Sequence, residues 1–169
     1  MGSDLLKKQL ELVRFERTLD YVRSSAGSAK KLNSGELAHL NQMLTTKQDD
    51  PWRVEPVTLS LPSGKEEHFS VISNGQKRAS DFINSAREKS HDGELALSAA
   101  GLYRDLILGH LFTDANRRTA VAAVSWLLME HSVSIPAMGL LELGVGDLRE
   151  KEAFEALVNL IKYSIRVAK

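Results

Sequence analysis

The sequence predicts a mostly α-helical domain with one β-hairpin. Along most of the chain, apolar residues recur at the three- and four-residue spacing of amphipathic helices. A segment at about residues 54–72 differs, because β-branched residues alternate there in part around Pro62-Ser63-Gly64, a typical turn sequence. The length of 169 residues suits one domain with a short helical appendage.

The helices before the hairpin are predicted from their apolar spacing and their end signals. The first runs over about residues 3–25, with Ser3 as its candidate N-cap, and the second covers residues 34–46. The linker between them, AGSAKKLN, is rich in small and polar residues. We therefore predict an N-terminal helix in residues 1–30 and a main domain in residues 31–169.

After the hairpin, the chain returns to helical patterning. Helices are expected at about residues 76–89, 93–109, 116–131 and 150–166. The segment SIPAMGLLELGVGDLRE, between the last two, is interpreted as a loop with a short turn. The predicted order is thus two helices, the hairpin, and then three or four helices.

Composition narrows the class of protein. Apolar residues make up 43% of the chain and charged residues 26%, which suits a soluble globular protein with a real core. The 22 basic and 22 acidic residues cancel, so no nucleic acid is expected as a partner. The chain has no cysteine and no long apolar run, which favours a cytoplasmic protein without a membrane partner.

Residues 110–118 concentrate polar side chains between two strongly apolar segments, LALSAAGLYRDLIL and TAVAAVSWLLMEH. Asn116 is a candidate N-cap for the helix that follows, and a helix start presents backbone N–H groups that suit phosphate. Arg117 and Arg118 would add charged donors at the same place. The sequence therefore predicts a phosphate-binding loop.

Two further residues of this loop point to catalysis. Asp114 would repel a phosphate unless Mg²⁺ lay between them, and Mg²⁺ prefers one or two carboxylates together with phosphate oxygens. His110, at the end of the preceding helix, has an ordinary pKa suited to accepting a proton near neutral pH. Phe112 is most simply an apolar anchor. The set suits transfer of part of a nucleotide to a hydroxyl group.

Each of these residues has a plainer explanation when it is taken alone. A histidine at a helix C-terminus commonly interacts with the last carbonyls, and paired arginines commonly form a solvated face. The close spacing of five polar residues between apolar flanks favours the functional interpretation. A zinc-dependent hydrolase is disfavoured, because the further ligands that zinc needs are lacking around His110 and Asp114.

The chain resembles the Fic/Doc (Fido) family, whose signature is His-x-Phe-x-Asp/Glu-Gly/Ala-Asn-Gly/Lys-Arg, in the stretch His110-Leu111-Phe112-Thr113-Asp114-Ala115-Asn116-Arg117-Arg118. The segments ELAHLNQMLT, DPWRVEPV and SVSIP also stand where Fic-type domains carry similar segments. The resemblance covers roughly residues 34–165. It implies that residues 31–169 form a Fic/Doc-like helical catalytic domain whose hairpin is the flap.

The resemblance also implies a role for each matching residue. His110 would be the general base for a Ser, Thr or Tyr hydroxyl of a target protein, Asp114 would hold Mg²⁺, and Phe112 would anchor the loop. The flap would hold a target segment by strand addition, and Trp52 and Arg53 are expected to anchor the flap. The phosphates of ATP would be bound by Thr113, Ala115, Asn116, Arg117 and Arg118.

Two positions depart from the commonest branch of the family, the AMP transferases. Those enzymes carry Gly at the position of Arg117 and a second Arg at that of Val121, whereas the Doc branch carries Lys and an apolar residue. The motif is therefore closer to Doc, in which the extra basic residue is linked to a reversed nucleotide and to phosphate transfer. The Fic-like hairpin and the chain length favour AMP transfer, so both reactions stay open.

The sequence lacks a full match to the inhibitory motif that regulates many Fic proteins. Many Fic proteins carry an inhibitory Ser/Thr-x-x-x-Glu-Gly/Asn helix, and residues 63–68 match it only in part and lie in the hairpin. Self-inhibition by this route is not expected. If the activity is harmful to its host, as that of a toxin in a toxin–antitoxin pair would be, restraint would have to come from a separate partner such as an antitoxin. The alternative interpretation of the whole chain is a catalytically silent Fic-fold module that binds proteins.

Overall fold

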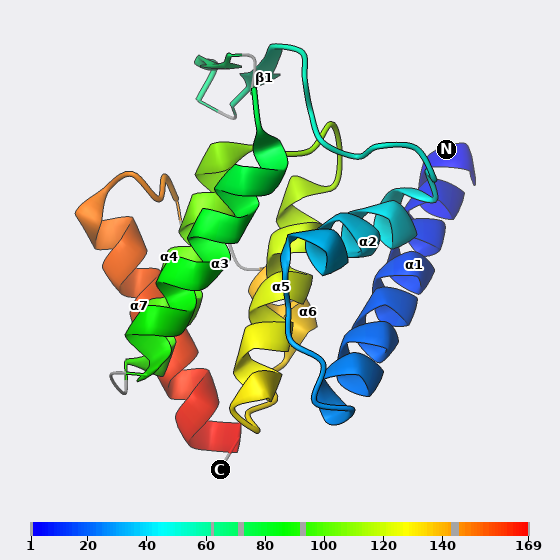
Figure 1. Ribbon diagram of the computed structural model, residues 1–169. Helices are drawn as coiled ribbons and strands as arrows, with labels where there is room; N and C mark the ends of the chain where they lie inside the picture. The colour runs from blue at the N-terminus through cyan, green and yellow to red at the C-terminus, as the bar shows by residue number, and fades with distance from the viewer. Residues whose placement is uncertain (1, 62, 71–72, 92–93, 143–145, 169) are drawn as a thin grey trace.

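The fold, a computed structural model, is described for residues 2–61, 63–70, 73–91, 94–142 and 146–168 (Figure 1). The prediction of a mostly α-helical fold with one hairpin is confirmed. The elements are α1 (Gly2–Gly27), α2 (Ser34–Thr45), β1 (Val57–Ser60), β2 (Glu66–Phe69), α3 (Gly75–His91), α4 (Leu95–Gly109), α5 (Asn116–Glu130), α6 (Ala137–Glu142) and α7 (Lys151–Ala168).

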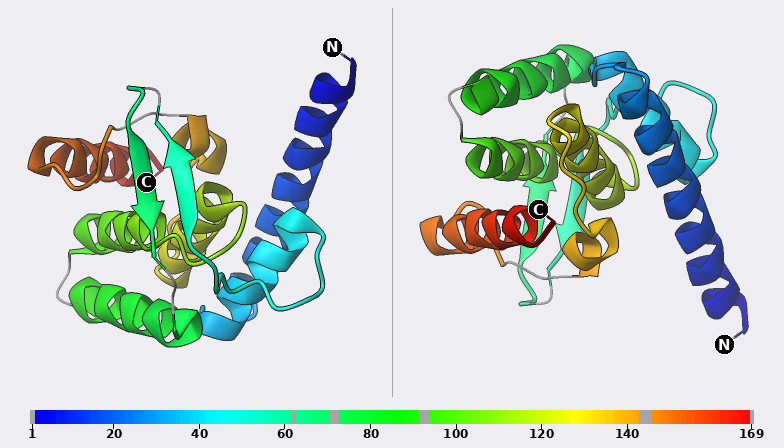
Figure 2. Two further views of the ribbon diagram at one scale, coloured as in Figure 1. Left: turned by 90° about the horizontal axis from the view of Figure 1, so that it is seen from above. Right: turned by 90° about the horizontal axis from the view of Figure 1, so that it is seen from below.

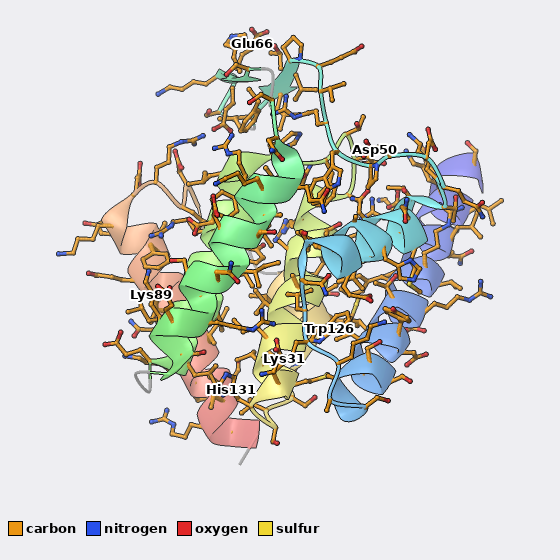
Figure 3. All side chains as sticks on the ribbon, in the orientation of Figure 1. Lys31, Asp50, Glu66, Lys89, Trp126 and His131 are labelled. Carbon is orange, nitrogen blue, oxygen red and sulfur yellow. The ribbon has the colours of Figure 1, made fainter. Side chains whose placement is uncertain are left out.

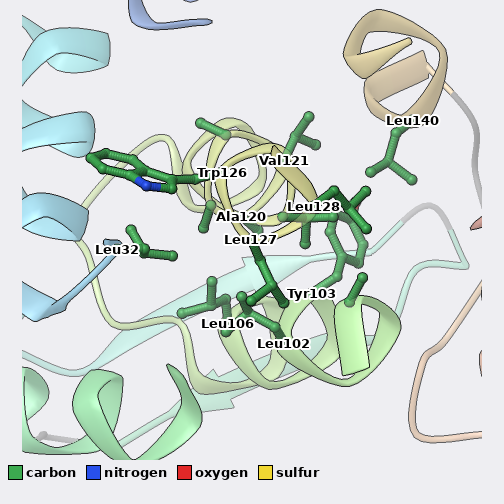
Figure 4. Close-up of a cluster of buried hydrophobic side chains, with 14 of the residues drawn as sticks. Leu32, Leu102, Tyr103, Leu106, Ala120, Val121, Trp126, Leu127, Leu128 and Leu140 are labelled. Atoms are coloured by element: carbon green, nitrogen blue, oxygen red, sulfur yellow. The ribbon is translucent and has the colours of Figure 1, made fainter. Parts of the chain in front are cut away.

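Helix α5 is the centre of the molecule. It packs against α1, α2, α4 and α6, and every residue from Thr119 to Leu128 is buried (Figure 1). A helix that is apolar on all sides is stable only when other elements surround it, which explains the sequence TAVAAVSWLL. In Figure 4, Leu127 of α5 meets Leu102 and Leu106 of α4.

Helix α1 joins this core through its C-terminal half only. Phe15, Leu19 and Val22 are buried, whereas the N-terminal half projects beyond the body of the molecule (Figure 2). The prediction of Ser3 as N-cap is wrong, because the helix already includes Gly2 and Ser3 lies in its first turn. Gly2 and Ser3 are both exposed, so no neighbouring segment prevents the helix from starting before Ser3. The division of the chain at residue 30 stays a prediction.

The hairpin covers one end of the helical body, above the ends of α4 and α5 that meet there (Figures 1 and 2). Its strands are antiparallel, with Val57 opposite Phe69 and Ser60 opposite Glu66. The turn is closed by Leu61 N–H, which donates to the Lys65 carbonyl at 2.8 Å. Pro62, which we expected in this turn, lies outside the described residues.

The hairpin and the predicted phosphate-binding loop lie at the same end of the helical body (Figure 1). Figure 3 places Asp50 and Glu66 toward the hairpin end, and His131 lies at the other end, where α5 finishes. The predicted phosphate-binding loop, residues 110–115, joins α4 to α5 directly below the hairpin.

No helix in the described ranges is both long and apolar enough to cross a membrane.

Candidate active site

The loop between α4 and α5 turns sharply at both of its ends. His110 is the C-cap of α4 with φ of 47°, and Ala115 is the N-cap of α5 with φ of 58°. The left-handed conformation costs a residue other than glycine about 1–2 kcal/mol. Two such residues within six positions therefore need support from the surrounding structure, and hydrogen bonds from three segments supply it.

Asn116 gives the first support, in a way that corrects our N-cap prediction. It is the first residue of α5, and Ala115 occupies the cap position. The Asn116 side chain instead accepts from Phe112 N–H at 3.0 Å and donates to the Phe112 carbonyl at 2.9 Å. The loop is so tight that the Asn116 amide reaches back to this peptide, and both of its polar ends are used there.

The same amide faces the catalytic candidate. Asn116 Nδ2 lies 3.3 Å from His110 Nε2. Because an amide nitrogen can only donate, the contact suits an Nε2 atom that carries no proton. This is the form of imidazole that a general base requires.

The imidazole of His110 is covered by the hairpin. Its ring stacks on the ring of Phe69 in β2, with centroids 4.6 Å apart and planes inclined by 18°. Burial lowers the pKa of His110 below the ordinary 6.5, and the nearby Arg53 cation lowers it further. The lowered pKa favours the neutral form of His110 at pH 7.

Phe112 holds the loop in place from below. It is 2% exposed, and its ring stacks on Trp52 with centroids 4.8 Å apart. The two residues also form an antiparallel β-bridge. Gly75 leaves the room for this packing, since a Cβ there would lie 3.1 Å from the Trp52 ring. This packing attaches the segment before the hairpin to the loop.

Asp114 keeps its carboxylate toward solvent. Its Oδ1 accepts from Ala115 N–H at 2.7 Å and lies 3.9 Å from Arg118 Nη2. The Asp114 backbone is fixed by Asn41 of α2, whose Nδ2 donates to the Asp114 carbonyl at 2.8 Å and to Thr119 Oγ1 at 3.1 Å. Asn41 is 2% exposed, so this amide is a buried strut between α2 and the loop.

A cavity of about 500 Å³ brings the predicted site residues together beneath the hairpin. Its floor combines the His110 imidazole, the Asp114 carboxylate and the start of α5, where backbone N–H groups lack helical partners. Its other wall comes from the hairpin and from the end of α4, and is apolar except for Glu67. The lining residues are Val57, Leu59, Leu61, Glu67, Phe69, Ile107, Leu108, His110, Thr113, Asp114, Ala115, Asn116, Arg117 and Arg118. Phe112 lies outside this lining, beneath the loop.

The cavity suits an anion that carries a metal ion. Two arginines stand at the N-terminal end of a 15-residue helix, where the helix dipole also favours negative charge. Asp114 is the carboxylate next to them. In the described part of the chain, no group of three or more His, Asp or Glu side chains is placed to hold a metal. A cation at Asp114 would therefore take its other ligands from phosphate and water, as Mg²⁺ does.

Four residues of the site were missed as site residues in the sequence. Phe69 and Asn41 carry no local signal, since each meets the loop from a distant segment. Arg53 was expected only to anchor the hairpin, and it also contacts His110. Glu67 lines the cavity and forms an ion pair with Arg149, in the turn before α7.

Comparison with known proteins gives a structural match. No protein-family model and no curated protein matches the sequence. Among solved structures, a Fic domain-containing signaling protein from Bacteroides thetaiotaomicron has a similar fold, with a TM-score of 0.68. The match covers 94% of this chain and 68% of that chain, at 16% sequence identity. The chain therefore has the fold of a Fic domain, as its motif predicted.

Proposed function

We propose that the protein transfers a phosphate-containing part of ATP, either AMP or phosphate, to a Ser, Thr or Tyr hydroxyl of a target protein. The observation that supports this most strongly is one cavity that joins a neutral histidine, an exposed carboxylate and an arginine-rich helix start. The fold of a Fic domain supports the same class of reaction.

Each predicted site residue that lines the cavity has a part in this reaction. Nε2 of His110 accepts the proton of the target hydroxyl, whose oxygen bonds to phosphorus while the bond from phosphorus to the leaving group breaks. The leaving group is pyrophosphate in AMP transfer and ADP in phosphate transfer. The contact with Asn116 Nδ2 suits an Nε2 atom that carries no proton before the reaction. Asp114 holds Mg²⁺, which supplies charge neutralisation when it is bound with ATP. Arg118, Arg117 and the backbone of Thr113 and Ala115 bind phosphate oxygens.

Two features bear on which phosphorus is attacked. Arg117 is exposed on the cavity wall, where it adds a cation at the position that the AMP transferases leave to glycine. Val121 is fully buried in the core, so α5 offers no second guanidinium there. Both features favour a Doc-like kinase, whereas the hairpin favours AMP transfer. The two reactions remain alternatives of one proposal.

A modifying activity that harms the host must be inhibited, and we propose that a separate antitoxin protein inhibits it. In the sequence, residues 63–68 resemble the inhibitory motif in part, and the described positions among them belong to the hairpin and its turn rather than to a helix. Val121 also lacks the charge that an inhibitory glutamate would engage.

Magnesium-dependent nucleotide binding tests the proposal. Calorimetric titration of ATP with Mg²⁺ should give binding that Asp114→Ala weakens by at least about tenfold, about 1.4 kcal/mol. Asp49→Ala is the matched control, because Asp49 is an exposed aspartate beside the same loop. Equal Mg-ATP affinity in Asp114→Ala and the parent would show that the metal assignment is wrong.

A further inference from the structure

Arg53 is a buried cation directly behind the catalytic candidate. It is 3% exposed, and in the described part of the chain it forms no ion pair with a carboxylate. A buried guanidinium is costly unless its N–H groups are satisfied. Nε and Nη1 of Arg53 donate to backbone carbonyls, and the positions of these carbonyls show what the residue holds in place.

The hydrogen bonds of Arg53 join three segments of the chain. Its Nε donates to the His110 carbonyl at 2.7 Å. Its Nη1 donates to the carbonyl of Glu55 at 2.6 Å, before the hairpin, and to that of Ser70 at 3.0 Å, after it. Its backbone N–H donates to the Leu111 carbonyl at 2.8 Å.

These bonds fix the base through its own backbone. His110 stands in the left-handed conformation that ends α4, and the side-chain direction at such a residue follows from the peptide planes on either side. Arg53 holds the carbonyls of both His110 and Leu111. The opposite end of the imidazole meets Asn116 Nδ2, so the ring is restrained from two directions.

The hairpin is restrained by the same guanidinium. Arg53 clamps the two chain segments at the base of the hairpin, and it lies 5.9 Å from the centroid of Phe69. Phe69 in turn stacks on the imidazole of His110. The base and the hairpin wall of the cavity are therefore built on one side chain.

We propose that Arg53 is a positioning residue for the reaction: it holds the backbone of His110 and the base of the hairpin as one unit, which aims Nε2 at a hydroxyl presented along the hairpin. This inference rests on the proposed function, since it assumes that His110 is the base.

The positive charge of Arg53 has a second consequence for the base. A cation near the imidazole disfavours protonation, and the pKa of His110 is lowered first by burial and then by Arg53. The other charged groups around the cavity are Glu67 on the hairpin, and Asp114, Arg117 and Arg118 on the loop and α5. Among these groups, Arg53 is the one whose hydrogen bond reaches the His110 backbone.

Two substitutions separate the geometry of Arg53 from its charge. Arg53→Met removes both, whereas Arg53→Lys keeps a cation and loses the planar guanidinium fork. Arg78→Met is the matched control, because Arg78 is an exposed arginine whose charge is felt at Arg53. Circular dichroism melting establishes that each variant is folded, and Arg53→Lys carries the kinetic test if Arg53→Met is not.

The first readout is the titration of His110 by NMR without nucleotide, with the resonance assigned from His110→Gln. We expect Arg53→Met to raise the pKa of His110, and Arg53→Lys and Arg78→Met to leave it low. The second readout is transfer kinetics. Both Arg53 variants should lower kcat by about 10- to 100-fold, as a displaced reacting group does, with KM for Mg-ATP unchanged.

The outcomes are distinct. The positioning role would be overturned if Arg53→Met left both the pKa of His110 and kcat unchanged. It would also be overturned if Arg78→Met changed both quantities as much as Arg53→Met does. If the parent protein labels no target, the proposed function fails, and the NMR titration alone decides whether Arg53 controls His110. A loss confined to KM would also overturn the inference, since it would place Arg53 in binding rather than in positioning.

Discussion

Phe69 of β2 lies face to face with the imidazole of His110, with ring centroids 4.6 Å apart. A residue of the hairpin thus covers one face of the His110 imidazole. Besides its proposed part in holding a target segment, the hairpin therefore takes part in the burial that lowers the pKa of His110. Four predictions follow from this arrangement and from the struts that support the loop.

Removal of the Phe69 ring should expose the base. We expect Phe69→Ala to raise the pKa of His110 toward 6.5, because burial is the largest cause of its lowered value. Transfer activity should fall, since the freed imidazole samples other orientations. NMR titration and kinetics measure the two effects. Phe69→Tyr keeps the stacked ring and should behave like the parent, and Leu59→Ala controls for a general change in the hairpin. An unchanged His110 titration in Phe69→Ala would contradict this role.

The rate should depend on pH in a way that reports the lowered pKa of His110. The base acts in its neutral form, so kcat/KM should stay high as the pH falls to 6.5 and decline only below it. The pH–rate profile of the parent measures this limb. A decline centred above pH 6.5 would mean that His110 is more exposed to solvent than the structure has it.

The same shift makes the stability of the protein depend on pH. Because the pKa of His110 is lower in the folded state, the unfolded state takes up the proton first as the pH falls through 6.5. The lowered pKa of His110 therefore leaves the free energy of unfolding unchanged well above pH 6.5, and it reduces this free energy progressively as the pH falls below 6.5. Thermal melting of the parent and of His110→Gln at pH 7.5 and pH 5 measures this, since the other histidines cancel in the comparison. The parent should lose stability relative to His110→Gln on acidification, and a constant difference would refute the assignment.

The buried amide of Asn41 should matter for both folding and metal binding. Asn41→Leu leaves the Asp114 carbonyl and the Thr119 hydroxyl without their donor, which costs about 1–3 kcal/mol of unfolding free energy. It should also weaken Mg-ATP binding, because the backbone of the carboxylate is freed. Urea unfolding and calorimetry measure the two losses. Gln42→Leu, at a neighbouring position with an exposed hydrogen bond, should change both by much less. Equal effects at the two positions would count against the strut.

An ion pair distant from the cavity should contribute to stability alone. Arg87 of α3 binds Glu130 of α5 at 2.8 Å, and the Glu130 side chain is only 7% exposed. Arg87→Ala should cost about 2–3 kcal/mol, because it leaves a nearly buried carboxylate unpaired. Lys77→Ala is the control on the same helix, since the Lys77–Asp81 pair is exposed and such pairs contribute about 0.5 kcal/mol or less. Chemical denaturation measures both values, and similar losses in the two variants would contradict the argument.

The local signals in the sequence were enough to predict most of the elements. The predicted helices at 76–89, 93–109 and 116–131 correspond to α3, α4 and α5, because their apolar spacing matches their buried faces. The alternation around the turn predicted the hairpin, although its strands are shorter than the span of 54–72.

The supports of the site could not be predicted in this way. Asn41 lies 73 residues from Asp114 in the chain, and Arg53 lies 57 residues from His110. Both act on backbone carbonyls, which every residue type has, so no residue pattern in the loop marks them as partners. The Asn116 prediction failed for a related reason. The side chain suits an N-cap, and only the tight path of the loop directs it to Phe112 instead.

Transfer of label from ATP tests the central claim most directly. The parent and His110→Ala are each incubated with Mg²⁺, a cell lysate and ATP labelled at either the α- or the γ-phosphate. The account predicts a labelled protein that depends on His110, from the α-phosphate for an AMP transferase or from the γ-phosphate for a Doc-like kinase. No His110-dependent label from either position would contradict the account and favour a catalytically silent module that binds proteins.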